Sequence, residues 1–182
     1  LAPLAGFKNL KALTIEAEHT VNISAFSSLS VLTTLSISCC KDITDLAHLS
    51  CLRNLRALTI SVCEKLNDIS ALASLEALNQ LEFNFPNAIE DYSVLTDLTS
   101  LSLLSIRNAP GLDNIELSAL QHLRVLELSE CKSLGKISLE TLPNLKVLWL
   151  KGCSELGGVD FLPHLTSLEV LSLHGCIKIT SL

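Results

Sequence analysis

A short apolar pattern recurs along the whole chain and constrains its fold more than any other feature. The pattern places apolar residues at its first, fourth and sixth positions, and its first copy is Leu10, Leu13 and Ile15. Further copies begin at Leu32, Leu55, Leu78, Leu101, Leu123, Leu145 and Leu168, so that successive copies are 22 or 23 residues apart. Such regular self-similarity is typical of chains whose units stack on one another, since one unit cannot bury its own apolar edge.

Each copy is predicted to form one short strand. Its last two apolar residues are separated by one residue, so they point to one face while the residue between them points away. Strands one repeat apart stack in parallel at about 4.8 Å, so eight of them line a curved surface roughly 34 Å long. We therefore expect a single domain of about eight repeats over residues 1–182.

The second half of each repeat is predicted to return the chain to the start of the next strand. The segment Asp68–Leu75 recurs with variations at residues 22–29, 91–98 and 158–165. Its apolar residues are spaced by three, which suits a short 3₁₀ or irregular helical turn better than a full α-helix.

Two returns, at residues 115–120 and 137–142, are one residue shorter than the others. We therefore expect a local change of twist or curvature between about Gly111 and Pro143.

A second periodic residue stands three positions beyond the last apolar residue of each copy. It is cysteine in five copies, namely Cys40, Cys63, Cys131, Cys153 and Cys176, and Glu18, Pro86 and Ala109 take its place in the others. A soft metal ion is one possible role, but metal ligands must converge on a point, whereas a ladder presents parallel side chains along a line. The favoured interpretation is that these thiols fill small buried gaps and donate weakly to turn carbonyls, with no metal and no cofactor.

Three residues near the ladder receive individual predictions. Cys39 occupies an exit position beside the groove where it could be exposed, and Cys51 is expected to be partly buried on a return segment. Phe85 is expected to fill the space that the missing ladder cysteine leaves beside Pro86.

The combined pattern L-x-x-L-x-L-x-x-C-x-x-L resembles the leucine-rich repeat family from end to end of the chain. The resemblance implies an α/β solenoid: a right-handed coil with a parallel β-sheet on its concave face and short 3₁₀ or irregular returns on its convex face. The D-I-S-x-L-x-x-L returns are similar to the class that includes bacterial internalins and the eukaryotic regulator of protein phosphatase 1. The cysteine ladder is similar to that of cysteine-containing F-box proteins or of trypanosome leucine-rich repeat proteins.

Charge and motifs exclude several classes of function. The net charge of −6 and the pI of about 5.3 oppose a nucleic-acid partner, because phosphate binding requires clustered Lys and Arg. No uncharged stretch is apolar enough for membrane insertion, and no phosphate-binding, nucleophile-elbow or zinc-protease motif is present, so we expect no enzyme. The seven cysteines are interpreted as reduced thiols of a cytoplasmic protein.

The residues that face away from the predicted core indicate where a partner would bind. The first three repeats present small side chains there, and the last five present larger ones, with the only tryptophan of the chain at Trp149. The predicted protein-binding patch on the concave face consists of Glu82, Asn84, Arg107, Glu127, Trp149, Lys151 and His174. Interface cores favour Trp and Arg, although Trp149 could instead pack only on its own sheet neighbours.

Two alternatives to a protein-binding module stay open. The chain could be a structural or assembly scaffold that acts through its ends by self-association, because neither Leu1–Leu4 nor Leu182 belongs to a polar capping repeat. The same feature, with the absence of methionine, suggests a piece of a longer protein. The resemblance alone implies the other alternative, a regulatory or substrate-receptor subunit of a phosphatase or a ubiquitin ligase.

Overall fold

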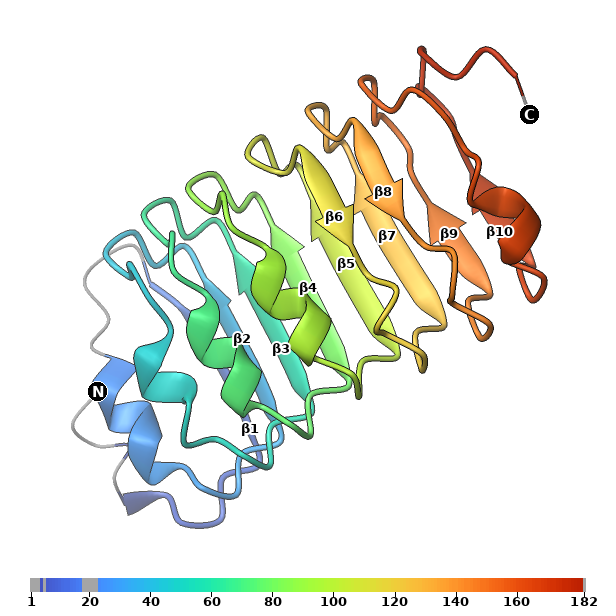
Figure 1. Ribbon diagram of the computed structural model, residues 1–182. Coiled ribbons are helices and arrows are strands. Elements are labelled where there is room, and N and C mark those ends of the chain that lie inside the picture. Colours follow the sequence, from blue (N-terminus) through green and yellow to red (C-terminus); the bar gives the residue numbers. More distant parts are fainter. Residues whose placement is uncertain (1–3, 5, 18–22, 182) are drawn as a thin grey trace.

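The computed structural model describes residues 4, 6–17 and 23–181. Within them, one parallel sheet runs the length of the molecule in the order β1-β2-β3-β4-β5-β7-β9-β10 (Figure 1). Its strands are β1 (Ala12–Glu16), β2 (Thr34–Ser38), β3 (Ala57–Ser61), β4 (Gln80–Asn84), β5 (Leu103–Arg107), β7 (Val125–Ser129), β9 (Val147–Trp149) and β10 (Val170–Ser172). Each predicted copy contributes one strand, which confirms the predicted architecture.

The strands pair in register with the sequence repeat. Leu58 of β3 lies opposite Leu35 of β2 on one side and Leu81 of β4 on the other. All three side chains are buried. Complete burial of one leucine side chain stabilises the fold by about 1.5–3 kcal/mol. A register shift by one residue would expose a whole row of these side chains and lose the stabilisation that each contributes.

Most of the returns on the opposite side of the core are 3₁₀ turns, as predicted. They are η2 (Ile23–Ser28), η3 (Ala47–Leu49), η4 (Ser70–Ser74), η5 (Ser93–Asp97) and η6 (Leu162–His164). Short polar side chains shape these turns locally: the carboxylate of Asp68 accepts a hydrogen bond from the N–H of Ser70 at 2.9 Å, and that of Asp91 accepts one from Ser93 at 2.8 Å.

The two shorter returns form strands instead of 3₁₀ turns. β6 (Asn114–Glu116) and β8 (Lys136–Ser138) pair in parallel as a two-stranded sheet that lies across the core from the main sheet (Figure 1). Ile115 and Leu117 are both buried, with Glu116 exposed between them. With one residue fewer, the apolar residues alternate and fit a period of two better than the spacing of three that a 3₁₀ turn requires. The structure thus shows a change of secondary structure at these two returns, and the expected change of twist or curvature stays a prediction.

Seven of the main strands, all except β1, are followed by a turn through one residue with left-handed backbone geometry. These residues have φ between 54° and 79° and are Cys39, Val62, Phe85, Asn108, Glu130, Gly152 and Gly175. The turn reverses the direction of the following side chain, which is the ladder residue, and directs it into the core. At Gly152, φ is +75°, which glycine adopts without strain; a Cβ atom there would lie 2.7 Å from the carboxyl carbon of Glu130, whose flexible side chain would have to move.

The cysteine ladder is buried, and its thiols donate to backbone carbonyls, as predicted. The Sγ atom of Cys153 lies 2.8 Å from the carbonyl oxygen of Leu128, and that of Cys176 lies 2.9 Å from the carbonyl oxygen of Leu150. Burial raises the pKa of Cys131 to about 11 and that of Cys153 to about 12, so both thiols are protonated at neutral pH.

Two of the individual predictions near the ladder are wrong. Phe85 does not fill the ladder gap: its side chain is 46% exposed, because the left-handed turn directs it outward and Pro86 takes the buried position itself. Cys51 is exposed, since it lies beyond the last buried residue of its 3₁₀ turn, Leu49. Cys39 is partly exposed, as expected. The predicted ladder position at Glu18 lies outside the described residues, as do Leu1 and Leu182 at the predicted uncapped ends.

Candidate functional site

Parallel pairing arranges the outward-facing residues of the main sheet in straight columns. In the column between the two buried positions, Glu127 of β7 lies beside Ser105 of β5 and Trp149 of β9. In the next column, Arg107 of β5 lies between Asn84 of β4 and Ser129 of β7. Lys151 and His174 continue this second column beyond the strands, where their carbonyl oxygens accept hydrogen bonds from Glu130 and Gly152 at 2.7 Å.

The structure therefore places all seven predicted patch residues on one surface. They lie on five neighbouring strands, from β4 to β10, or in the turns that extend them. Four steps of about 4.8 Å give a patch roughly 19 Å long. The exposure of their side chains differs strongly along this length. We call Glu82, Asn84, Arg107 and Glu127 the inner part of the patch, and the three exposed residues Trp149, Lys151 and His174 its outer part.

Glu127 is the centre of the inner part. Its Oε2 atom accepts a hydrogen bond from Nη2 of Arg107 at 2.5 Å and another from Oγ of Ser105 at 3.0 Å. Glu127 and Ser105 are both buried although they face the concave side, and the side chain of Arg107 remains 43% exposed. The sequence predicts Glu127 at the surface, because the alternation of a strand gives the direction of a side chain but not how far its neighbours cover it.

The charges of the inner part stabilise each other. Burial on its own would raise the pKa of Glu127, but hydrogen bonds from Arg107, Ser105 and Ser129 and the charge of Arg107 outweigh it and lower that pKa. The hydrogen bond with Glu127 raises the pKa of Arg107, and the negative charges of Glu127 and Glu82 add to the rise. The pair is therefore fully charged at neutral pH.

Asn84 and Glu82 border this pair on the side of β4. The side-chain amide of Asn84 donates to the hydroxyl of Ser61 at 3.1 Å, which holds the amide against the bland surface of β3. Glu82 is partly exposed, and among the described residues no hydrogen bond to its carboxylate is present. In the inner part of the patch, Arg107 and Glu127 thus bond to each other, Asn84 bonds to a neighbour outside the patch, and Glu82 borders them without a hydrogen bond among the described residues.

The outer part consists of Trp149, Lys151 and His174, all of which are exposed. Trp149 is 38% exposed and lies between Glu127 and Ser172 in its column. Beside it, Val125, Val147 and Val170 form an aliphatic column that is only partly covered. A large aromatic side chain therefore stands at the concave surface with the valine column on one flank and Lys151 and His174 on the other.

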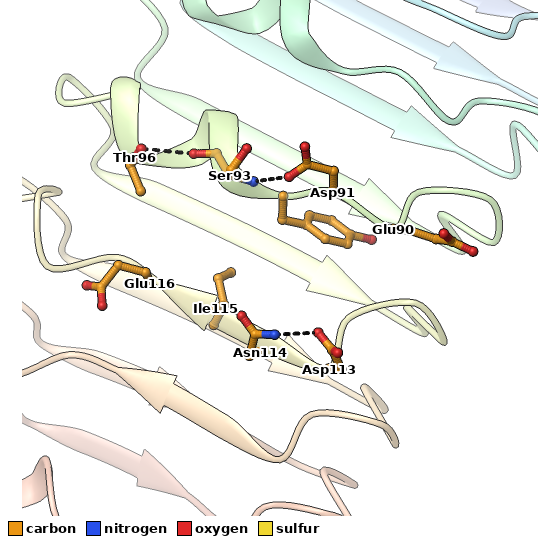
Figure 2. A pocket seen from close by; sticks show the side chains of 9 residues that line it. Glu90, Asp91, Ser93, Thr96, Asp113, Asn114, Ile115 and Glu116 are labelled. Carbon is orange, nitrogen blue, oxygen red and sulfur yellow. Dashed lines mark hydrogen bonds between the residues drawn. The ribbon is translucent and has the colours of Figure 1, made fainter.

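A separate hollow of about 410 Å³ lies on the convex side, where the 3₁₀ returns give way to the two short strands (Figure 2). Its walls come from the segment at η5 and from β6, and they carry several carboxylates. Asp91 accepts a hydrogen bond from Ser93, and Asp113 accepts one from the amide of Asn114 at 2.7 Å (Figure 2). The carboxylate of Asp91 therefore bonds the first backbone N–H of η5, and that of Asp113 bonds the side chain of its neighbour in the sequence.

In the described part of the chain, no group of three or more His, Cys, Asp or Glu residues is placed to hold a metal ion. Within the same residues, no helix has the length and apolar character needed to cross a membrane.

Comparisons with known proteins support the fold. The internalin C2 structure from Listeria monocytogenes is 24% identical with a TM-score of 0.72, and the match covers 92% of this chain and 73% of that chain. The leucine-rich repeat domain of the type III effector XopL is 23% identical with a TM-score of 0.74, covering 98% and 73%. The functional domain of InlJ from Listeria monocytogenes, which includes a cysteine ladder, is 18% identical with a TM-score of 0.56, covering 98% and 47%.

No protein-family model matches the sequence, and no curated protein matches it. The structural similarity therefore concerns the fold. The predicted likeness to leucine-rich repeat proteins, with internalins and a cysteine ladder among the similar structures, is confirmed at that level.

Proposed function

We propose that this chain, a leucine-rich repeat protein by its fold, is a non-enzymatic interaction module that binds a protein partner on its concave face. The observation that carries the proposal is the exposed Trp149 beside Glu127, which holds Arg107 in place on the same surface. Tryptophan and arginine dominate the binding energy of protein interfaces when they lie near the centre of a contact. A partner that covers Trp149 and the flanking valines would remove this apolar surface from water.

The inner polar network supports the same proposal by making the surface rigid. Arg107 is fixed by Glu127, so it presents its exposed guanidinium N–H groups, though not the buried Nε–H, without the entropy loss that a free arginine side chain would incur on binding. Lys151 and His174 lie toward the solvent and would form the polar rim of the contact. We expect acidic groups of the partner opposite these two residues.

End-to-end self-association is a second candidate function. The last described repeat exposes apolar side chains, since Val170 is 44% exposed, Leu171 is 40% exposed and Ile177 is 78% exposed. A second copy stacked on this surface would cover them. Light scattering over a range of concentrations separates the two candidates, because only stacking makes the apparent mass rise with concentration.

Two further predictions remain proposals. A reducing, cytoplasmic location is supported by the seven free cysteines of the chain. A role as the regulatory subunit of a phosphatase or a ubiquitin ligase depends on the family resemblance alone, and no contact in the described residues adds to it.

The experiment that tests the main proposal is affinity capture with matched variants. Arg107→Ala is a poor probe, because it would leave Glu127 buried without its counter-ion. A double variant Trp149→Ala, Lys151→Ala changes only the outer part of the patch, and circular dichroism should show that it keeps the fold of the native protein. The control is Thr14→Ala, Thr59→Ala, which alters the same surface in the bland first repeats.

A protein captured by the native chain should be bound at least about tenfold more weakly by the Trp149 and Lys151 variant and equally well by the control. If all three chains capture the same proteins equally, the partner does not bind to the concave patch and the proposal is rejected.

A further inference from the structure

The charges of the molecule are distributed very unevenly around the solenoid. The turns that lead into the main strands lie along one edge of the sheet, which we call the strand-start rim. The rim consists of residues 8–11, 30–33, 53–56, 76–79, 99–102, 121–124, 143–146 and 166–169. It contains six of the thirteen Lys and Arg residues of the chain but only two of its nineteen Asp and Glu residues. A protein with a net charge of −6 thus has one edge that is clearly positive.

Backbone hydrogen bonds show that the rim is a continuous surface. The last residue of each rim turn donates its N–H to the carbonyl oxygen of its counterpart one repeat earlier. These bonds are 2.8–2.9 Å long and connect Lys11, Thr33, Arg56, Asn79, Ser102, Arg124, Lys146 and Glu169 in succession. The side chains at this position therefore stand in one row, about 4.8 Å apart.

The two acidic residues of the rim are already paired. Glu169 forms an ion pair with Lys146 at 2.5 Å, and Glu76 faces Arg53 at 3.8 Å. Lys11, Arg56 and Arg124 are exposed and form no ion pair with any described residue. Three cations of the row are thus left without a counter-ion, and the repeat spacing separates Arg56 from Arg124 by about 14 Å.

The surface between Arg56 and Arg124 is hollowed and polar. A hollow of about 560 Å³ beside Arg56 and one of about 600 Å³ beside Arg124 and His122 share Asn79 in their walls. The remaining lining residues are small or neutral polar ones, and no carboxylate lines either hollow in the described part of the chain. Hydroxyl and amide groups between two free cations suit a ligand that carries negative charges at its ends and hydrogen-bonding groups between them.

We propose that the strand-start rim binds an acidic, extended segment of a partner protein. An extended chain advances about 3.3 Å per residue, so carboxylates about four residues apart would reach Arg56 and Arg124 together. The intervening backbone would lie over Asn79 and Ser102. The amide of Asn79 donates one N–H to the carbonyl of Ser100 at 3.2 Å and keeps a second for a peptide carbonyl, and the Ser102 hydroxyl, which donates to Asn79 at 2.8 Å, can accept from a peptide N–H. This rim is a different surface from the concave patch, and the proposal does not depend on the function proposed above.

The rest of the molecule favours a protein segment over nucleic acid. Outside the rim the chain has seventeen acidic and seven basic residues, so a long phosphate backbone would be repelled beyond the few cations of the rim. A short acidic peptide would experience only the rim, because exposed charges more than about 10 Å away are largely screened at 0.1 M salt.

The test measures fluorescence anisotropy of a fluorescein-labelled Gly/Ser peptide of about twelve residues, with glutamates placed about four positions apart. A second peptide of the same composition has its glutamates adjacent. The full chain is compared with the variant Arg56→Glu, Arg124→Glu and with the control Lys41→Glu, Lys132→Glu. The control makes the same charge change at exposed sites away from the rim.

The proposal predicts saturable binding of the spaced peptide at about 0.1 M salt, binding at least about tenfold weaker in the rim variant, and unchanged binding in the control. The peptide with adjacent glutamates should bind more weakly than the spaced one. The proposal is overturned if no binding occurs, if both variants lose affinity equally, or if the two peptides bind alike. It is also overturned if an oligothymidylate or phosphatidylserine vesicles compete better than the spaced peptide, since the rim would then recognise phosphate.

Discussion

The buried carboxylate of Glu127 offers a direct test of how the concave surface is held together. Glu127→Gln keeps the shape of the side chain but removes the charge that bonds Arg107 and Ser105. Hydrogen bonds to charged groups contribute about 1.5–3 kcal/mol, but Arg107 is 43% exposed and recovers part of this from water. We therefore expect the free energy of unfolding at pH 7 to fall by about 1 kcal/mol.

The same variant should change how stability depends on pH. Because the folded state lowers the pKa of Glu127 below its ordinary value of 4.5, the carboxylate stabilises the protein above about pH 4.5. This contribution disappears as the pH falls through the folded-state pKa. The difference in stability between the native protein and Glu127→Gln should therefore be constant near neutral pH and shrink below pH 4.5.

Urea unfolding followed by circular dichroism measures both effects, with Glu82→Gln as the matched control. Glu82 lies in the same column and also near Arg107, but no hydrogen bond holds its carboxylate among the described residues. Equal stabilities of the two variants at pH 7 would refute the reasoning. So would a loss in Glu127→Gln that does not change between pH 7 and the acid range.

Two further predictions concern the turns and the ladder. Val62→Asn should raise the free energy of unfolding by about 1 kcal/mol, because a left-handed φ of 54° strains a β-branched residue. Asparagine tolerates this geometry, as Asn108 shows with φ 56° at the equivalent position. A melting temperature no higher than that of the native protein would contradict this. With a thiol reagent at pH 8, the exposed Cys51 should react in the folded protein. Cys131 and Cys153 should react only after unfolding, since burial keeps both thiols protonated. Rapid reaction of all seven cysteines in the folded protein would contradict the buried ladder.

Much of the fold follows from the sequence because the repeat leaves little freedom. The alternation in Leu58 and Ile60 gives the direction of each strand residue, and equal repeat lengths place equivalent residues side by side. The columns that contain Trp149 and Arg107 could therefore be assigned before any coordinates. The 3₁₀ returns follow in the same way from the spacing of three between apolar residues.

The remaining features depend on contacts between repeats or on backbone geometry. The burial of Glu127 could not be predicted, because it depends on the hydrogen bonds that Arg107 and Ser105 of the neighbouring strand donate to its carboxylate. The outward position of Phe85 could have been found, since Gly152 and Gly175 at equivalent positions indicate a left-handed turn. The alternation of Ile115 and Leu117 likewise contained the signal for β6, but the helical character of the other returns concealed it.

We propose that a partner covers the outer part of the concave patch. Because Trp149 is the only tryptophan of the chain, its fluorescence reports directly on whether a partner covers this surface. Its fluorescence should be open to acrylamide quenching in the free protein, because the residue is 38% exposed. When a captured partner without tryptophan is added, the emission should shift to shorter wavelength and quenching should decrease. If the complex forms and both the emission and the quenching of Trp149 stay unchanged, the partner binds elsewhere and the claim is contradicted.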